Sequence, residues 1–147
     1  MLRIYLDACC LQRPFDDQTQ PRIRVETEAV LAILASVQVG DVTMLNSEAL
    51  EYEISRIPNE QRRHEAFALL TLAGERLAIS DQVESLAEVL EERGIHPMDA
   101  VHLALASTYR ADYFATCDDA LLRKAKQESG LSCKPLSILE LFTEIHP

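Results

Sequence analysis

The chain has 147 residues, 48% of them apolar, and a formal net charge of −10, which suits one domain with a buried core over residues 1–147. No apolar run reaches the ~20 residues of a membrane helix, and Asp7 lies where an export signal needs its apolar centre, so we expect a cytoplasmic protein with no membrane contact. The excess acid argues against nucleic acid binding, which normally depends on Lys and Arg, unless some of the carboxylates hold a cation.

The first half of the sequence predicts two strands and three helices. The strands are short apolar runs, at residues 3–6 and 42–45. The helices have apolar residues at helical spacing, at residues 23–39, about 47–57 and 60–72. Two prolines and two adjacent aspartates predict a loop over residues 11–21. Gly40 is the expected C-cap of the first helix, and Asn46 or Ser47 the N-cap of the second.

The second half continues the alternation. Residues 77–80 are ambiguous between strand and loop, and two further strands are expected at 113–116 and about 135–136. A helix is expected over 81–93, with Asp81 as its N-cap and Gly94 ending it, and another begins at Pro97. A third helix is expected from Asp118 or Asp119 to near residue 130, and a fourth over 137–145. Strands alternating with helices predict an α/β fold, a three-layer α/β/α sandwich around a short, mostly parallel sheet. Such sheets bind ligands at the carboxyl ends of their strands.

Three acids fall at informative places. Asp7 directly follows the first strand, and Asp118 follows the third by two residues; each could instead be a turn residue or helix cap. Asp99 is the third residue of a helix that is otherwise apolar. The helix dipole favours an acid there, but burying it is costly unless a cation or another partner pairs with it. His102 lies one turn on and is read as a core histidine with its hydrogen bonds satisfied, for which Asp99 is one candidate partner.

The helix after the second strand offers a fourth acid. Taking the apolar face of that helix as reference, Glu53 lies about 65° from its centre, Glu51 about 95° and Glu48 about 155°. Glu53 therefore borders the buried face and is the best placed to enter a cleft, whereas Glu48 and Glu51 are expected to be solvated. Since Glu51 is only two residues away, the choice between it and Glu53 stays open.

Four carboxylates from four elements make a hard, oxygen-ligand site, for which Mg²⁺ is the appropriate cation and Mn²⁺ a substitute. The chain has no Gly-rich phosphate loop and no Gly-x-Ser-x-Gly motif. Its four cysteines lack the Cys-x₂-Cys spacing of zinc sites and are expected to be reduced and partly buried. Cys9 or Cys10 as a nucleophile has no obvious basic partner in the sequence.

With these residues in place, the chain resembles the PIN domain, the fold of many VapC-type toxin ribonucleases. The matching segments lie in the same order along nearly the whole chain: IYLDAC at 4–9, SEALEYE at 47–53, HPMDAVHLA at 96–104 and ADYFATCDD at 111–119. The resemblance implies a Mg²⁺-dependent endoribonuclease. Its acidic quartet, both catalytic and metal-binding, would be Asp7, Glu53, Asp99 and Asp118. The Cys9–Cys10 pair and the loop from Arg13 to Gln18 depart from the pattern of these toxins.

The resemblance also implies roles around the quartet. Thr116 matches a Thr-x-Asp pattern and would orient the substrate or the Asp118 carboxylate, while Ser47 matches a small polar residue often found after the second strand. Arg13 is a further candidate for substrate binding. The family further implies a homodimer, an RNA substrate and a possible antitoxin partner.

Basic residues are expected to flank the acids and hold RNA in a single-stranded or loop region. They are Arg13, Arg22, Arg24, Arg123, Lys124 and Lys126. Two rival functions stay open. One is a catalytically silent PIN-like module that binds a protein partner; the other is a phosphotransfer domain with Asp7 as nucleophile, which the cysteine at position 9 disfavours because the usual pair is Asp-x-Asp.

Overall fold

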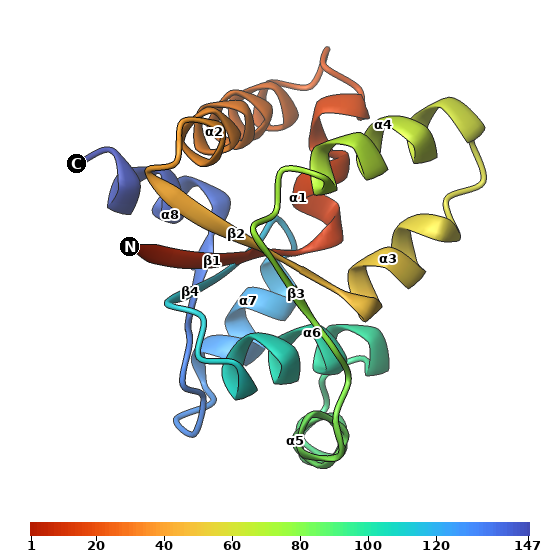
Figure 1. Cartoon of the computed structure of the whole chain (residues 1–147), viewed down its shortest axis with the longest axis vertical. Coiled ribbons are helices and arrows are strands. Elements are labelled where there is room, and N and C mark those ends of the chain that lie inside the picture. The colour runs from red at the N-terminus through yellow and green to blue at the C-terminus, as the bar shows by residue number, and fades with distance from the viewer.

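The computed structural model describes residues 1–147 and has a parallel sheet at its centre (Figure 1). Its strands are β1 (Leu2–Leu6), β2 (Val42–Ser47), β3 (Glu75–Leu77), β4 (Tyr113–Thr116) and β5 (Lys134–Ser137). They lie in the order β3-β2-β1-β4-β5, and every neighbouring pair is parallel. The predicted α/β class with a parallel central sheet is confirmed.

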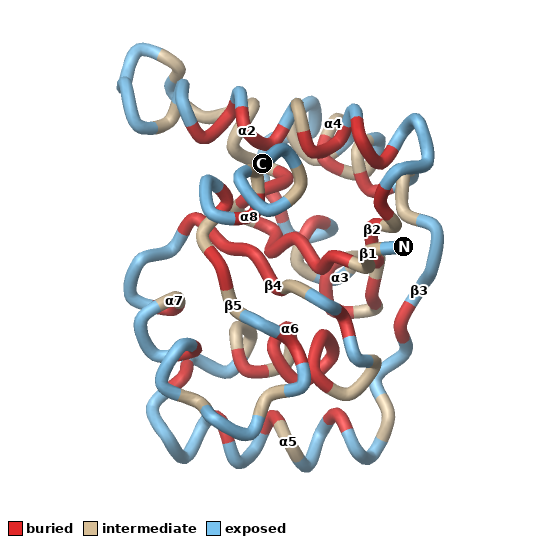
Figure 2. The backbone as a smooth tube through the Cα atoms, turned by 90° about the vertical axis from the view of Figure 1, so that its left-hand side faces the viewer, coloured by how far each residue is buried: buried red, intermediate tan, exposed pale blue.

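Helices cover both faces of this sheet. They are α1 (Ala8–Gln12), α2 (Pro21–Gln38), α3 (Glu48–Ser55), α4 (Glu60–Leu70), α5 (Asp81–Glu92), α6 (Pro97–Thr108), α7 (Asp119–Lys126) and α8 (Ile138–Ile145), with a short 3₁₀ turn, η1, at Arg13–Phe15. Seen from the side, α2, α4 and α8 lie on one face and α5 and α6 on the other (Figure 2). The three predicted layers are therefore present. No helix is both long and apolar enough to cross a membrane.

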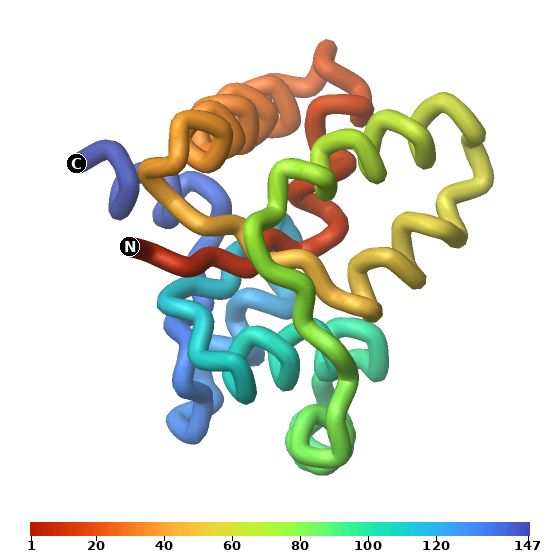
Figure 3. The backbone as a smooth tube through the Cα atoms, viewed as in Figure 1, coloured from red at the N-terminus to blue at the C-terminus, as the bar shows by residue number.

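Strand β1 is the central strand of the sheet, and this position accounts for its apolar sequence. Ile4, Tyr5 and Leu6 are fully buried, as expected for a parallel strand with helices on both faces. The chain runs from β1 to β2 and β3 on one side and then returns to β4 on the other side (Figure 3). The carboxyl ends of β1 and β4 therefore form the switch in strand order where α/β sheets bind ligands.

The pairing register brings two distant segments together at this switch. Leu6 pairs with Ala115, and the backbone N–H of Asp7 donates to the Ala115 carbonyl at 2.9 Å. Asp7 and Thr116, the residues that follow these partners, therefore lie side by side. This register positions Asp7, Thr116 and the residues that directly follow them.

Two sequence predictions were wrong in detail. The predicted loop over residues 11–21 is partly helical, because Asp7 caps α1 immediately after β1 and Pro14 sits early in η1, where a missing N–H costs nothing. Helix α5 is capped by Ser80, whose side chain accepts from the N–H of Val83, so Asp81 is its first residue and not its cap. The ambiguous stretch over 77–80 holds the end of β3.

Other local signals were correct. Gly40 and Gly94 follow α2 and α5 with φ of +85° and +93°, the left-handed backbone that glycine adopts freely. Ser47 caps α3 and Asp118 caps α7 through their side chains. These caps fix where each helix begins, and so where its first acidic residues lie.

Candidate active site

Asp7 is the most constrained of the four predicted acids. Its Oδ1 accepts from the N–H of Ala8 at 2.8 Å, and its Oδ2 accepts from the Thr116 hydroxyl at 2.9 Å. Only 5% of the residue is exposed. Burial raises the pKa of Asp7 well above its ordinary value, and the neighbouring Cys9, Glu53 and Asp99 add to the rise, although His102 lowers it. A nearby cation would favour its ionised form.

Glu53 is held by a chain of buried polar groups that crosses the helix–sheet interface. Its Oε1 lies 2.7 Å from His102 Nε2, and His102 Nδ1 lies 2.6 Å from the Tyr5 hydroxyl. The Tyr5 hydroxyl in turn lies 2.7 Å from Ser47 Oγ, which accepts from the N–H of Leu50. His102, Tyr5 and Ser47 are fully buried. This series of hydrogen bonds therefore connects β1, β2, α3 and α6 and fixes the carboxylate of Glu53.

His102 sits between two of the acids. Its Nε2 is 4.0 Å from Asp7 Oδ1 as well as hydrogen-bonded to Glu53. Burial lowers the pKa of His102, but the hydrogen bond to Glu53 and the charges of Asp7, Glu53 and Asp99 outweigh it, so the pKa is raised. As predicted, His102 is a satisfied core histidine; its partners are Glu53 and Tyr5, and the candidate hydrogen bond to Asp99 is absent.

Asp99 and Asp118 face the solvent side of the cluster. They line a hollow of about 260 Å³ together with Ile95, His96, Ala120, Leu121 and Lys124. Asp99 is half-buried and Asp118 is exposed. Burial raises the pKa of Asp99, and the charges of Asp118 and Glu53 raise it further against the lowering effect of His102 and His96. Asp118 also accepts from the N–H of Leu121 at 3.0 Å as the cap of α7.

Two of the four acids, Asp7 and Glu53, lie in one compact group, and Asp99 and Asp118 lie outside it at the adjacent hollow. Ligand atoms of Asp7, Glu53 and His102 all lie within 4.8 Å of one another. The charges of Glu53 and Asp99 raise the pKa of Asp7, and the charge of Asp118 raises the pKa of Asp99. Mutual repulsion of this kind is relieved by a cation. The donor set is made of carboxylate oxygens, because both nitrogens of His102 are already hydrogen-bonded, and it fits a hard divalent cation.

The neighbouring acids on α3 have other partners. Glu51 forms an ion pair with Arg76 at 2.8 Å and accepts from Asn46. Glu48 accepts from the N–H of Ile79 at 2.8 Å. Both were expected to be solvated; they are half-exposed, and their partners connect α3 to the segment around β3. On α3, the position facing the other acids is therefore that of Glu53, as its helix angle predicts.

The three predicted substrate-binding residues are placed as follows. Thr116 is buried, donates to Asp7 and accepts from the N–H of Asp118 at 3.1 Å, so it links two of the acids. Ser47 is fully buried, and its hydroxyl supports α3 and Tyr5. Arg13 forms ion pairs with Asp16 and Glu26, both at 3.0 Å. Their contact with a substrate stays a prediction.

The basic residues expected near the acids are mostly paired. Arg22 bonds both carboxylate oxygens of Asp119 at 2.8 Å, and Lys126 forms an ion pair with Glu140. Lys124 donates to the Gly94 carbonyl at 2.8 Å, which places its ammonium group at the hollow beside Asp99 and Asp118. Of these basic residues, Lys124 is the one placed at the hollow that Asp99 and Asp118 line.

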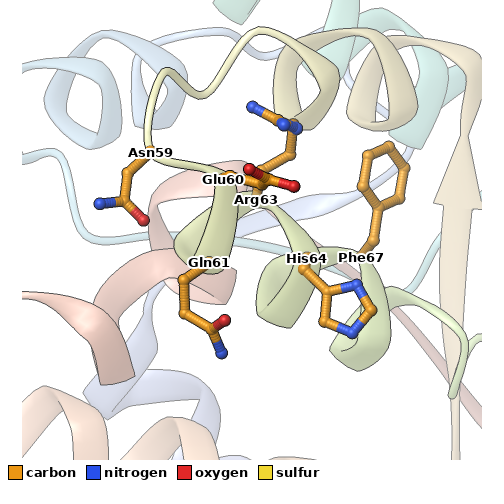
Figure 4. Close-up of a pocket in the computed structure, with 6 residues that line it drawn as sticks. All are labelled: Asn59, Glu60, Gln61, Arg63, His64 and Phe67. Atoms are coloured by element: carbon orange, nitrogen blue, oxygen red, sulfur yellow. The ribbon is translucent and has the colours of Figure 1, made fainter.

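A larger hollow, of about 580 Å³, lies elsewhere, along the first turns of α4 (Figure 4). It is lined by Asn59, Glu60, Gln61, Arg63, His64 and Phe67. It holds a single carboxylate, that of Glu60, beside Arg63 and His64, and so lacks the paired acids of the other site. Its size therefore does not make it the better candidate for chemistry.

Tyr5 is the residue of the site that sequence reasoning missed. A tyrosine within a buried strand must find a partner for its hydroxyl, and a histidine within an apolar helix must do the same. The sequence alone shows that Tyr5 and His102 each need a hydrogen-bond partner. That they meet each other, with Glu53 beyond, depends on how α6 packs on β1.

Comparisons with known proteins agree with this fold. A family model described as PIN domain matches residues 4–127, a range that contains all four acids. The chain is similar to PAE2754 from Pyrobaculum aerophilum, with a TM-score of 0.60 and 15% identity over 98% of this chain and 89% of that one. It is also similar to the structure of VapBC2 from Rickettsia felis bound to a DNA fragment from their promoter, with a TM-score of 0.59 and 12% identity over 92% of this chain and 98% of that one. No curated protein matches.

Proposed function

The chain belongs to the PIN domain family, and on that premise we propose that it is a Mg²⁺-dependent endoribonuclease that hydrolyses phosphodiester bonds in RNA. The observation that supports the proposal is that Asp7 and Glu53 meet at the switch in strand order with ligand atoms within 4.8 Å of each other, while Asp99 and Asp118 line the adjacent hollow. They come from four different elements, so a purely local role as turn or cap residues does not explain their meeting. Mn²⁺ is expected to replace Mg²⁺ because both prefer oxygen ligands.

In this proposal the four carboxylates hold the divalent cation, which, when bound, would polarise the scissile phosphate and lower the pKa of a water. The remaining residues position those carboxylates. Thr116 and the N–H of Ala8 each fix one oxygen of Asp7, and His102 fixes Glu53. Such fixed ligands need little reorganisation when the substrate arrives.

The hollow beside Asp99 and Asp118 is the proposed entry for the RNA backbone. Lys124 lines it and supplies a positive charge next to the acids. A phosphodiester brought against four carboxylates would otherwise be repelled, and the chain as a whole is strongly acidic. The cation and Lys124 together are proposed to offset that repulsion.

The test is cleavage of a labelled single-stranded RNA by the native chain and two matched variants. Asp99→Asn removes one carboxylate of the cluster, and Asp119→Asn removes an exposed acid paired with Arg22 outside it. Loss of several kcal/mol of transition-state stabilisation corresponds to ~10²-fold or more in rate, which we expect for Asp99→Asn only. Calorimetric titration with Mg²⁺ should show the same contrast in binding.

Two results would overturn the proposal. One is the absence of cleavage with both Mg²⁺ and Mn²⁺ together with no Mg²⁺ binding at millimolar concentration, which would favour a silent protein-binding module. The other is cleavage that chelation does not stop. Covalent phosphorylation of Asp7 by a phosphodonor would instead support the phosphotransfer alternative.

We further propose that the chain is the toxin of a toxin–antitoxin pair and forms a homodimer. Its similarity to VapBC2 and the VapC-like motifs support this role. Production of the native chain in a bacterial host should arrest growth, and Asp99→Asn should relieve the arrest. Light scattering of the purified chain tests the dimer, and a monomeric mass would contradict it.

A further inference from the structure

Three of the four cysteines meet behind the acid cluster. Cys9 and Cys10 lie on α1, and Cys117 lies between β4 and α7. All three sulfur atoms are within 4.8 Å of one another, and the sulfurs of Cys10 and Cys117 are 3.7 Å apart. We refer to these three residues as the thiol trio. The sequence showed no metal-binding spacing, because the trio forms only when β4 pairs with β1.

The spacing of the trio matches that of thiolates around one ion. With a Zn–S distance of about 2.3 Å, tetrahedral geometry places two sulfur ligands roughly 3.8 Å apart. The separation between Cys10 and Cys117 already has this value. Small side-chain rotations would bring Cys9 to the same distance. The backbone that carries the three sulfurs therefore needs little movement to surround a cation.

One backbone donor at the trio suits charged sulfur, whereas two of the thiols also face acceptors: Cys9 Sγ donates to Asp7 Oδ2 at 3.4 Å and Cys10 Sγ to the Ala115 carbonyl at 3.5 Å. The N–H of Cys117 points at Cys9 Sγ, at 3.3 Å, as N–H donors do toward metal-bound thiolates. Cys9 Sγ also lies 3.4 Å from Thr116 Oγ1, and it is half-buried, while Cys10 and Cys117 are buried. A cation could reach the trio past Cys9 and would then be largely shielded from water.

Cys133 shows what an ordinary buried cysteine looks like in this chain. It precedes β5, is only 4% exposed and has no other cysteine beside it. A cysteine of that kind fills space as a small apolar residue. Three thiols converging from two segments about 107 residues apart need more than space-filling as an explanation.

We propose that the thiol trio binds one thiophilic d¹⁰ cation, Zn²⁺ or Cu⁺, at a site distinct in its donors from the carboxylate cluster. Thiolate ligands select these soft ions over Mg²⁺, which prefers oxygen. Three sulfurs complete a trigonal Cu⁺ site, whereas Zn²⁺ would add a water as fourth ligand on the open side of Cys9. The proposal holds whether or not the chain cuts RNA.

The test uses the full-length chain, kept reduced with a phosphine and free of oxygen. Co²⁺ serves as the spectroscopic probe for the Zn²⁺ arm, because sulfur ligands give a thiolate-to-cobalt charge-transfer band that carboxylates do not. A chromophoric chelator competes for the cation in each arm, Zn²⁺ or Cu⁺, with Mg²⁺ in excess to occupy the carboxylates. Native mass spectrometry counts the bound ions.

We expect one equivalent of Zn²⁺ or of Cu⁺, with the thiolate band present in the Co²⁺ form. Cys117→Ser should weaken binding by ~10²-fold or more, since it removes a ligand rather than a supporting group. Cys133→Ser is the matched control and should bind like the native chain. Asp99→Asn, which alters the carboxylate cluster, should keep the thiolate band. Preference for one ion over the other identifies the cation.

Three outcomes would overturn the proposal: neither ion is retained against the chelator, Zn²⁺ is the ion retained but the Co²⁺ form has no thiolate band, or binding is lost in Asp99→Asn and kept in Cys117→Ser. Circular dichroism checks that each variant is folded. If Cys117→Ser does not fold, Cys9→Ser replaces it, because the half-exposed Cys9 tolerates the change best. Binding by Cys9→Ser equal to that of the native chain would also contradict the assignment.

Discussion

The two halves of the acid cluster differ in how firmly they are held. Asp7 and Glu53 form one half, which we call the buried half after the partners that hold it: Asp7 is itself buried, the Glu53 side chain is 34% exposed, and their carboxylates are hydrogen-bonded to Thr116, the backbone and His102. Asp99 and Asp118 form an open half around the hollow. The contrast teaches that two of the proposed ligands are held by buried partners, whereas the other two lie at an open hollow, where Asp118 is held as the cap of α7.

The buried half also contributes to the fold. His102, Tyr5 and Ser47 have no access to water, so each depends on its neighbour for a hydrogen bond. Removing one member leaves another buried and unpaired, at a cost of about 1–3 kcal/mol. The open half carries no such penalty, because water can replace a lost partner there. Substitutions in the two halves should therefore separate effects on stability from effects on chemistry.

The largest difference is expected between Asp7→Asn and Asp118→Asn. Asparagine at position 7 keeps an oxygen for the N–H of Ala8 but removes the fixed negative charge, so we expect cleavage of RNA to fall by ~10²-fold or more. Asp118→Asn retains the helix cap and should lose less activity. Single-turnover cleavage rates measure both. Equal losses of cleavage rate in the two variants would mean that the two halves of the cluster do not differ in their contribution to cleavage.

A second test acts on the buried chain of hydrogen bonds. Tyr5→Phe leaves His102 Nδ1 and Ser47 Oγ without their shared partner, and we expect the free energy of unfolding to fall by about 1–3 kcal/mol. Urea denaturation measures this. Tyr113→Phe is the control, since the Tyr113 hydroxyl contacts only the exposed Glu144 at 3.3 Å and should matter little. A Tyr5→Phe variant as stable as the native protein would show that this series of hydrogen bonds does not contribute to stability.

Local signals in the sequence account for most of what could be predicted. The strand that ends at Asp7, the caps at Ser47 and Asp118 and the first-turn Pro97 depend on neighbouring residues, so they can be read without the fold. The helix angle of Glu53 also depends only on its own helix. These features explain why the carboxylate positions could be named in advance.

The contacts between distant segments could not be read in this way. The bond between Tyr5 and His102 joins residues 97 positions apart, and the thiol trio joins α1 to the end of β4. Both follow from which strand lies beside β1 and in which register, and the sequence carries no local signal for either. The loop predicted after residue 11 failed for a related reason, because the five-residue α1 is too short to show a helical pattern.

The acidity of the cluster predicts a dependence of stability on pH. The pKa values of Asp7 and Asp99 are raised mainly by burial, so the folded chain holds their protons longer than the unfolded chain does. Their contribution is full below the ordinary carboxyl pKa of about 4 and is lost as pH rises to the raised values. The raised pKa of His102 acts in the same direction above about 6.5.

We therefore expect the unfolding free energy, measured by urea denaturation in chelator, to fall in the native chain relative to Asp99→Asn as pH rises. Added Mg²⁺ should reduce this difference. Glu51 gives the opposite sign, because Arg76 lowers its pKa and its contribution is lost as pH falls. If the difference between native chain and Asp99→Asn does not change with pH, Asp99 has an ordinary pKa.

The smallest effect is expected for Glu51→Gln. The ion pair between Glu51 and Arg76 is exposed, and such pairs add little to stability. Cleavage by Glu51→Gln should match that of the native chain, whereas Glu53→Gln, two residues away on α3, should impair it. Rates measured side by side for the two variants make the comparison. The reverse order would assign the fourth ligand to Glu51.

The pairing of β1 with β4 also sets when the site can exist during synthesis. Thr116, which fixes Asp7, follows it by 109 residues. At ~5–20 residues per second, a ribosome needs roughly 5–20 s to add them. Until then the nascent chain carries Asp7 without the hydroxyl that holds it and without β4 beside it. The acid cluster is therefore completed only after β4 has been synthesised, and the growing polypeptide carries an incomplete site until then.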